Sequence, residues 1–247
     1  MFKKRLSIMV PAFNEERNLE NTVKEIKKGI AKKLETYEIL IFDDGSKDKT
    51  GETADKLART YQNVKTFHNK KNLGTGYCYS KGLELAKYEH YMYIPGDNQF
   101  PAQAISLMLQ SLGAADIIIP YVTNMHIRPF MRRVVSTLYT SLINFLFGLN
   151  IIYYNAPVIH KTSLLRGVIP RKNSGHAYQT YILVNLIKAG ASYTEVGFNM
   201  YERKSGGTSA FKLKNIIRVV NTLFSMFWNI NIRRRLQVSK AVRKMLS

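Results

Sequence analysis

An apolar segment that ends in two carboxylates constrains this chain more than any other part of its sequence. Residues 37–46 read Tyr-Glu-Ile-Leu-Ile-Phe-Asp-Asp-Gly-Ser. An apolar run bounded by turn residues predicts a strand buried on both faces, as in a parallel sheet. Ligands of open α/β sheets bind beyond the carboxyl ends of strands, so Asp43 and Asp44 could bind a base, a ribose or a cation. The alternative is a plain strand-to-helix turn with Ser46 or Asp48 as the helix cap.

Strand and helix patterns alternate four times over residues 1–120. Between the expected strands lie helical patterns, the first of which begins at Asn14 as its N-cap and continues to about Lys33. This alternation predicts an α/β fold with a single, doubly wound, mostly parallel sheet. The expected strands are residues 6–13, 37–43, 64–68, 91–94 and 117–120.

A second acidic strand end follows residues 91–94, where the chain reads Pro95-Gly-Asp-Asn-Gln. Asp97 and Gln99 are two residues apart on an irregular turn, and both can direct oxygen atoms at one hard cation. The alternative is that Asp97 is an ordinary turn residue before a helix that starts near Pro101. Two acidic strand ends in one sheet favour a ligand site at this edge.

Positive charge is concentrated in the second half of the chain. Residues 1–117 contain 18 Lys and Arg against 15 Asp and Glu, whereas residues 118–247 contain 19 against only Glu195 and Glu202. The second half is therefore expected to meet an anionic partner, such as substrate phosphates, an anionic membrane or nucleic acid. The only cysteine, Cys78, excludes an intrachain disulfide and suits a reducing cytosol.

Two segments of the second half are amphipathic. Residues 134–160 contain no Asp, Glu, Lys or Arg, but their continuous apolar runs are too short to span a bilayer. The pattern predicts a helix that lies either at a membrane interface or on the core. A last helix, about residues 211–230, carries Phe224, Phe227 and Trp228 and precedes three arginines, which is common at membrane surfaces, although a solvated basic tail is the alternative.

Five motifs stand in one order along the chain. They are Val10-Pro11-Ala12-Phe13-Asn14-Glu15, Asp43-Asp44-Gly45-Ser46, Asn72-Leu73-Gly74, Gly96-Asp97-Asn98-Gln99 and Glu202-Arg203-Lys204-Ser205-Gly206-Gly207-Thr208-Ser209. Together they resemble glycosyltransferase family 2, with the GT-A fold. The resemblance covers about residues 5–225, and the branch that it is most similar to is the dolichyl- or polyprenyl-phosphate mannosyl- and glucosyltransferases.

The resemblance implies a role for each matching position. Asp97 and Gln99 would hold Mg²⁺ or Mn²⁺ against the donor diphosphate, and Arg203 would bind phosphate, so that Asp97 and Arg203 are the expected catalytic residues. The nucleotide would be bound by Pro11, Asn14, Glu15, Asp43 and Asp44. The acceptor phosphate would be bound by Arg128, Arg132 and Arg133.

Two positions depart from the family pattern. Pro95 stands where the family usually has the first acid of an Asp-x-Asp motif. Residues 153–155 are Tyr-Tyr-Asn, in a neighbourhood where the branch tends to have an acid. These departures leave one carboxylate at the expected metal site and change the acceptor side.

The acceptor half also lacks an obvious general base. Transfer to a hydroxyl normally needs one, and residues 174–180 contain no carboxylate, so that His176 is the one candidate there. A surface or structural histidine is the alternative for His176. A phosphate acceptor is already ionised and needs cations instead, which this half supplies.

The sequence therefore predicts an inverting GT-A enzyme, in one domain over residues 1–247. It would move a hexose from GDP-mannose or a UDP-sugar to a polyprenyl or dolichyl phosphate, as a peripheral protein on the cytoplasmic face of the cell membrane. An anionic membrane surface, and possibly a membrane protein, would be its partners, and nucleic acid would not. The alternatives are a family 2 enzyme acting on a sugar hydroxyl of a glycan and, remotely, a basic nucleic-acid-binding protein. The expected parts are a nucleotide-sugar half (1–120), an acceptor half (121–210) and an amphipathic basic segment (211–247).

Overall fold

The computed structural model describes residues 4–168, 177–200, 213–233 and 236–246. Within them, one seven-stranded sheet runs through both halves of the chain in the order β3-β2-β1-β4-β6-β5-β7. All neighbouring strands are parallel except for the pairs that β6 makes with β4 and β5. The expected mostly parallel α/β sheet is therefore confirmed. The strands are β1 (Arg5–Ala12), β2 (Thr36–Asp43), β3 (Val64–His68), β4 (His90–Tyr93), β5 (Ile117–Val122), β6 (Ile159–Lys161) and β7 (Tyr193–Phe198).

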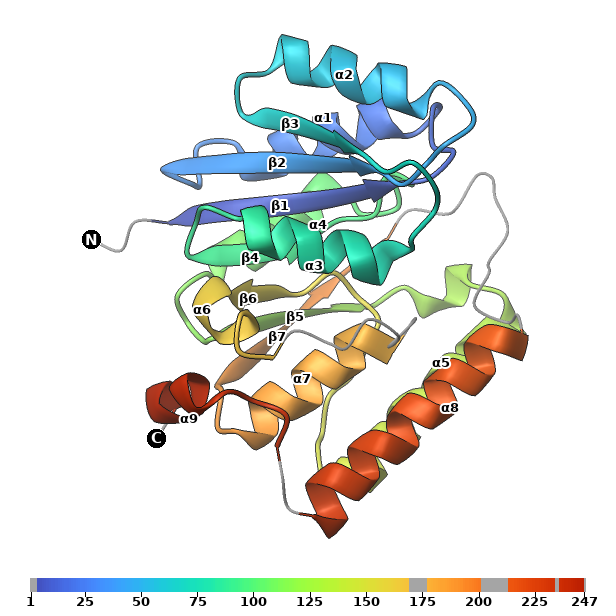
Figure 1. Cartoon of the computed structure of the whole chain (residues 1–247), viewed down its shortest axis with the longest axis vertical. Coiled ribbons are helices and arrows are strands. Elements are labelled where there is room, and N and C mark those ends of the chain that lie inside the picture. Colours follow the sequence, from blue (N-terminus) through green and yellow to red (C-terminus); the bar gives the residue numbers. More distant parts are fainter. Residues whose placement is uncertain (1–3, 169–176, 201–212, 234–235, 247) are drawn as a thin grey trace.

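Helices cover both faces of the sheet, and each face has its own apolar core (Figure 1). Alternate residues of β2 supply the two cores, because successive side chains of a strand point to opposite faces. Ile39 and Ile41 pack with α1, α2 and α4, whereas Leu40 and Phe42 pack in the core that α3, α5, α6, α7 and α8 cover. The helices are α1 (Leu19–Ile30), α2 (Thr50–Thr60), α3 (Thr75–Leu85), α4 (Ala102–Gln110), η1 (Met125–Ile127), α5 (Phe130–Phe147), α6 (Thr162–Leu165), α7 (Tyr178–Lys188), α8 (Leu213–Phe227), η3 (Trp228–Ile232) and α9 (Lys240–Leu246).

The expected start of the first helix is wrong. The helix α1 begins at Leu19, with Asn18 at the cap position, and it ends at Ile30. Asn14 has a positive φ of 56° and belongs to the turn that follows β1. Asparagine tolerates this left-handed conformation better than most residues, and a polar side chain there can bond to nearby backbone instead of capping a helix.

The strand β6 has no counterpart in the sequence-based prediction. It spans only Ile159–Lys161, and it lies antiparallel between β4 and β5. Three residues are too few to show an alternating pattern. This strand connects the four-stranded N-terminal part of the sheet, β3-β2-β1-β4, to β5 and β7.

The helix α8 runs along α5, in front of it in the view of Figure 1, at one side of the molecule. Ile143 and Phe147 of α5 share an apolar core with Leu223 and Met226 of α8. Asn144 points inward, since its side chain bonds to the backbone of Ile151 at 2.9 and 3.2 Å. Among the described helices, none combines the length and the apolar character that crossing a membrane requires.

Candidate active site

Three loops meet at the edge of the sheet where β1, β2 and β4 end. The amide of Asp44 donates to the carbonyl of Ala12 at 2.8 Å, and the amide of Gly96 donates to the carbonyl of Pro11 at 3.1 Å. A Cβ atom at Gly96 would lie 3.1 Å from that same carbonyl oxygen, so that a larger residue would have to push the two loops apart by a few tenths of an ångström. The sequence-predicted residues of the β1, β2 and β4 ends are thereby brought together.

The loops after β1 and β2 are joined by reciprocal hydrogen bonds. The backbone amide of Asn14 donates to the hydroxyl of Ser46 at 3.0 Å, and the Asn14 side-chain oxygen accepts from the amide of Lys47 at 2.9 Å. The amide of Glu15 donates to the hydroxyl of Thr50 at 2.7 Å. Asn14 and Glu15 therefore fix the position of the loop that carries the two carboxylates of β2.

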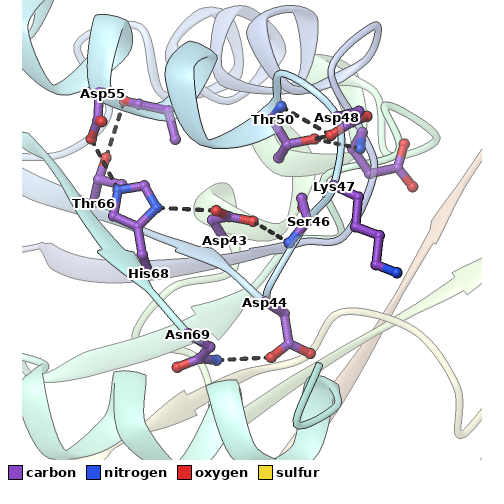
Figure 2. Close-up of polar contacts among 12 residues, drawn as sticks. Asp43, Asp44, Ser46, Lys47, Asp48, Thr50, Asp55, Thr66, His68 and Asn69 are labelled. Carbon is purple, nitrogen blue, oxygen red and sulfur yellow. Dashed lines mark hydrogen bonds and ion pairs between the residues drawn. The ribbon is translucent and has the colours of Figure 1, made fainter. Parts of the chain in front are cut away.

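The carboxylate of Asp43 is nearly buried and lies between a loop amide and a histidine (Figure 2). Its Oδ1 accepts from the amide of Ser46 at 3.0 Å, and its Oδ2 lies 3.0 Å from Nδ1 of His68. Burial acts to raise the pKa of Asp43, but the hydrogen bonds from Ser46 and His68 outweigh it and hold the pKa below its usual value. Asp43 is therefore an anion at neutral pH, and an ionised carboxylate can only accept hydrogen bonds.

His68, at the end of β3, lies between two carboxylates. Its Nδ1 faces Asp43, and its Nε2 lies 3.1 Å from Asp55 on α2. The hydrogen bond with Asp43 raises the pKa of His68, and Asp55 adds to the effect against the opposing effect of burial. We expect an NMR titration to give a pKa above about 6.5 for His68 and to give a lower value in Asp43→Asn.

The pH dependence of stability follows from this raised pKa. The protonated His68 stabilises the fold fully below its unfolded pKa of about 6.5, and the contribution is lost as the pH rises through the higher folded pKa. We expect the difference in the free energy of unfolding between the native protein and His68→Gln to shrink over that window. An equal difference at low and high pH would contradict the ion pair.

Asp44 is more deeply buried than Asp43, and its carboxylate holds the loop before α3. Its Oδ1 accepts from the side-chain amide of Asn69 at 2.8 Å and from the amide of Leu73 at 2.9 Å, and its Oδ2 accepts from the amide of Gly74 at 2.7 Å. Gly45 makes room for that loop, since it has a φ of 74° and its Cβ would lie 2.5 Å from the backbone of Lys71. Asp44 thus braces the segment that contains the Asn-Leu-Gly motif.

Asp97 lies on the turn after β4, and its Oδ1 accepts from the backbone amide of Gln99 at 3.2 Å. Between them, Asn98 has a φ of 56°, and its amide donates to the hydroxyl of Thr22 on α1 at 3.0 Å. That hydroxyl also donates to the carbonyl of Gly96 at 3.0 Å. The turn is therefore anchored to α1, which fixes where the half-buried Asp97 and Gln99 lie at this edge.

Arg128 lies just before α5, in the segment that follows the end of β5. Its Nη1 donates to the hydroxyl of Tyr153 at 2.8 Å, and its guanidinium lies 5.3 Å from the centre of the Tyr153 ring. Its Nε and Nη2 contact the sulfur of Met200 at 3.2 and 3.1 Å. Asn124 fixes Met200 in turn, through two hydrogen bonds with its backbone. The arginine is therefore positioned by contacts with two other segments of the chain, which contain Tyr153 and Met200.

Tyr93 at the end of β4 connects the Asp97 turn to the Arg128 side. Burial, with smaller contributions from Tyr153 and Asp97 and against the hydrogen bond with Tyr178, raises the pKa of Tyr93 to about 12. Asp97 and Tyr153 therefore both act electrostatically on the Tyr93 hydroxyl, and Tyr153 is also the residue to which Arg128 donates.

The remaining sequence-predicted residues lie further from this centre or outside the described residues. Arg132 and Arg133 are half-buried in the first turns of α5, and the Arg133 guanidinium lies 5.6 Å from the centre of the Phe130 ring. Arg203, its polar glycine loop and His176 lie outside the described residues. The carboxylate of Glu195 accepts a hydrogen bond from the amide of Ile152 at 2.7 Å and so supports the loop before Tyr153. Burial raises the pKa of Glu195.

A family model named glycosyl transferase family 2 matches residues 7–166, which is more than half of the chain. The chain belongs to glycosyl transferase family 2. The matched residues include the ends of β1, β2 and β4 and also Arg128, so that these parts of the candidate site lie within the family match.

Curated relatives of this family 2 chain include enzymes whose names contain a lipid phosphate. A dolichol-phosphate mannosyltransferase of Pyrococcus furiosus is 28% identical over 137 residues, which is 53% of this chain and 38% of that protein. The human dolichyl-phosphate beta-glucosyltransferase is 32% identical over 107 residues, or 40% of this chain and 33% of that protein. An uncharacterised protein of Methanocaldococcus jannaschii is 28% identical over 76% of this chain and 84% of its own length. The chain thus spans well under half of the two named enzymes.

Solved structures of the same fold include glucosyl-3-phosphoglycerate synthase from Mycobacterium tuberculosis. Its complex with uridine diphosphate has a TM-score of 0.69 at 14% identity, over 91% of this chain and 80% of that chain. A complex of the same synthase with Mn²⁺ and uridine diphosphate has a TM-score of 0.66. These neighbours establish the GT-A fold of this family 2 protein.

The residues of this family 2 site suit a divalent cation that is shared with a substrate. The described residues contain no cluster of three or more His, Cys, Asp or Glu side chains that could hold a metal. Mg²⁺, however, is usually bound by one or two carboxylates together with substrate phosphates and water. Asp97 supplies one carboxylate and Gln99 one amide oxygen, which fits such a site and does not fit a cage built by protein alone.

Three functional contacts of the family 2 site could not be read from the sequence. Tyr153 as the partner of Arg128, His68 as the partner of Asp43 and Asn69 as a donor to Asp44 all come from segments distant in sequence. A partial signal did exist for His68 and Asn69, since His68 ends the predicted strand 64–68 and Asn69 follows it, so that both reach the same sheet edge. The family resemblance marked residues 153–155 as a departure on the acceptor side, but no pattern indicated that Tyr153 contacts Arg128.

Proposed function

We propose that this chain is an inverting hexosyltransferase that uses a nucleoside diphosphate sugar, such as GDP-mannose or a UDP-sugar. Its acceptor would be a polyprenyl or dolichyl phosphate, at the cytoplasmic face of a membrane to which the chain binds as a peripheral protein. Membership of family 2 and the named lipid-phosphate relatives support the reaction class. Residues 1–120 would act as the donor half, residues 121–210 as the acceptor half and residues 211–247 as a membrane-facing segment of one catalytic domain.

The donor nucleotide would lie across the ends of β1 and β2. Asp43 is the better suited of the two carboxylates to accept hydrogen bonds from a base or ribose, since the carboxylate of Asp44 already accepts three hydrogen bonds from the loop before α3. The turn at Pro11, Asn14 and Glu15 would form the wall of the nucleotide pocket, because its hydrogen bonds hold it against the β2 loop.

The position of Arg128 carries the proposal for the acceptor. Its guanidinium is held by Tyr153, in the half of the chain in which residues 117–194 contain no Asp or Glu. A phosphate monoester is ionised at neutral pH, so that it attacks without a general base but needs cations to bind it. Arg132 and Arg133 follow in the first turns of α5 and would extend the cationic surface that receives this phosphate.

The chemistry would then be a single in-line displacement. An oxygen of the acceptor phosphate forms a bond with the anomeric carbon of the sugar while the bond from that carbon to the donor diphosphate breaks, and the nucleoside diphosphate leaves. Asp97 and Gln99 would hold Mg²⁺ or Mn²⁺, which neutralises the charge that develops on the leaving diphosphate. Arg203 would add a second cation there, while the fixed positions of Asp43 and Arg128 align the two substrates.

Replacing Arg128 tests the acceptor assignment. We expect Arg128→Ala to raise the KM for polyprenyl phosphate by about tenfold to a hundredfold, because a charge-assisted pair of hydrogen bonds is lost, with little change in the KM for the donor. Tyr153→Phe should raise the same KM by a smaller factor, since it removes only the hydroxyl that orients the guanidinium.

Arg166→Lys is the matched control, because Arg166 bonds to the carbonyl of Ala86 and lies outside this site. A rise in the donor KM, or a fall in kcat alone, in Arg128→Ala would contradict an acceptor-binding role.

A matched acceptor pair tests the proposed function itself. Purified protein would receive a panel of radiolabelled nucleotide sugars with either a short polyprenyl phosphate or the corresponding uncharged polyprenol. We expect label to enter the organic phase with the phosphate only. Label on the polyprenol, or on a sugar hydroxyl of an oligosaccharide, would favour a family 2 enzyme that acts on hydroxyl groups instead.

A further inference from the structure

An unusual number of large apolar side chains of α5 face away from the protein. Phe130 and Met131 are each 67% exposed, Leu138 is 65% exposed and Phe145 is 85% exposed. The polar residues of α5 are not all on this outer face. Instead Tyr139 bonds to Thr180 of α7 and Asn144 bonds to the loop before β6, both of them inward. The amphipathic helix is therefore turned so that much of its apolar side lies outside.

The neighbouring helix α8 and the turn η3 continue the same apolar surface. Val220 is 57%, Phe224 67%, Trp228 44% and Ile232 54% exposed. The rings of Phe224 and Trp228 stack with their centres 6.4 Å apart. Inward-facing Leu223, Met226 and Ile230 of the same segment are buried, so that the exposed set forms one stripe on the outer side of the helix.

The two stripes lie on neighbouring helices. Figure 1 shows α8 running along α5 and in front of it, their inner residues share one apolar core, and Asn231 of η3 donates to the carbonyl of Leu146 at the end of α5 at 2.6 Å. We call this surface the α5–α8 face. Its outer residues are Phe130, Met131, Val135, Leu138, Leu142 and Phe145 of α5 with Val220, Phe224, Trp228 and Ile232 of α8 and η3.

Described arginines border the α5–α8 face, within a half of the chain that is strongly basic in sequence. Residues 118–247 contain 19 Lys and Arg and only two carboxylates, and Arg132, Arg133 and Arg233 lie at the ends of the two helical segments. An apolar stripe with aromatic residues and a basic border matches an anionic bilayer, in which acyl chains receive the apolar groups and headgroups receive the cations. A second copy of this chain would instead bring another strongly basic surface against it.

We propose that the α5–α8 face is a membrane-docking surface that inserts its apolar side chains into an anionic lipid leaflet. The choice of a membrane as its occupant rests on the proposed function, since a polyprenyl phosphate is confined to a bilayer. Arg128 lies two residues before α5, in the segment that joins the end of β5 to this helix. Docking in this orientation places the acceptor arginines at the level of the lipid headgroups.

The single tryptophan of the chain makes this proposal directly measurable, because Trp228 lies on the α5–α8 face itself. Purified full-length protein would be mixed with phosphatidylcholine vesicles with or without phosphatidylglycerol, and with no polyprenyl phosphate. We expect a blue shift of the Trp228 emission with the anionic vesicles, and quenching by acyl chains that carry bromine. Binding without any change in Trp228 emission would mean that another surface docks, and would overturn the proposal.

Substitutions on the face provide the second measurement. We expect the double variant Phe145→Gln and Phe224→Gln to bind anionic vesicles at least about tenfold more weakly, because two exposed aromatic side chains no longer enter the acyl region. The matched control is Met245→Gln, a 60% exposed apolar residue on α9, away from the face. The control should bind like the native protein.

The outcomes separate this proposal from the proposed function. Equal vesicle binding by the double variant and the native protein would overturn the docking surface. The face would instead be assigned to a second copy if light scattering showed a dimer that the same variant abolishes and if no vesicle binding were seen. Sugar transfer to a detergent-dispersed polyprenyl phosphate is read independently, so that its failure would contradict the function and leave the vesicle result standing.

Discussion

Replacing Asp97 with asparagine is expected to lower kcat for sugar transfer by about a hundredfold or more, with the protein still folded. Asp97 is the carboxylate at the end of β4, and in the proposed mechanism its charge stabilises the cation that faces the leaving diphosphate. The amide can still accept from the amide of Gln99, so that the turn after β4 is kept. Steady-state kinetics with Mg²⁺ and with Mn²⁺, together with circular dichroism, would measure both parts of this result.

Asp116→Asn is the matched control for that substitution. Asp116 directly precedes β5 and therefore lies at the amino end of this strand, away from the candidate site. There it pairs with Lys161 at 2.7 Å and accepts a hydrogen bond from Ser192. The same chemical change there should reduce stability without reducing the turnover of the folded protein. Near-native turnover of Asp97→Asn would contradict the role given to this carboxylate.

Replacing Asp44 with alanine is expected to lower the free energy of unfolding by about 2–4 kcal/mol, because buried donors lose their acceptor. The three donors are the side chain of Asn69 and the backbone amides of Leu73 and Gly74. Donor binding should weaken as well, since the segment before α3 is no longer held against β2. Chemical denaturation and a titration with the nucleoside diphosphate would measure the two effects.

An exposed acid of the neighbouring helix serves as the control for Asp44. Glu52→Gln on α2 should change the free energy of unfolding by about 0.5 kcal/mol or less, as is usual for exposed positions. A loss in Asp44→Ala no larger than that of the control would mean that the three hydrogen bonds contribute little to the fold.

The parallel core of the fold was predictable from sequence because local patterns determine it. Apolar runs such as 37–42 end in turn residues, and a strand buried on both faces is the only structure that uses such a run between helices. The start of α1 was mispredicted because asparagine is a common helix cap. Asn14 instead bonds to Ser46 and Lys47, which lie more than 30 residues further along the chain. Contacts across that separation leave no local pattern.

The candidate site was predictable only in part, for a related reason. Asp43, Asp44 and Asp97 follow strands, and strand ends of a parallel sheet meet at one edge, so that their proximity follows from topology. Tyr153 comes from an irregular segment, and no periodicity indicates that it meets Arg128. Similarly, an amphipathic pattern over residues 134–160 shows that α5 has two faces, but only its packing on α7 determines which of them is turned outward.

The most direct test of the account is the mass of the lipid product. Purified protein would be incubated with a nucleoside diphosphate hexose, Mg²⁺ or Mn²⁺ and a short polyprenyl phosphate, and the organic phase would be analysed by mass spectrometry. The account predicts a lipid that has gained one hexose and kept its phosphate, with one nucleoside diphosphate released for each product. Donor consumed only by hydrolysis, with the polyprenyl phosphate unchanged, would contradict it.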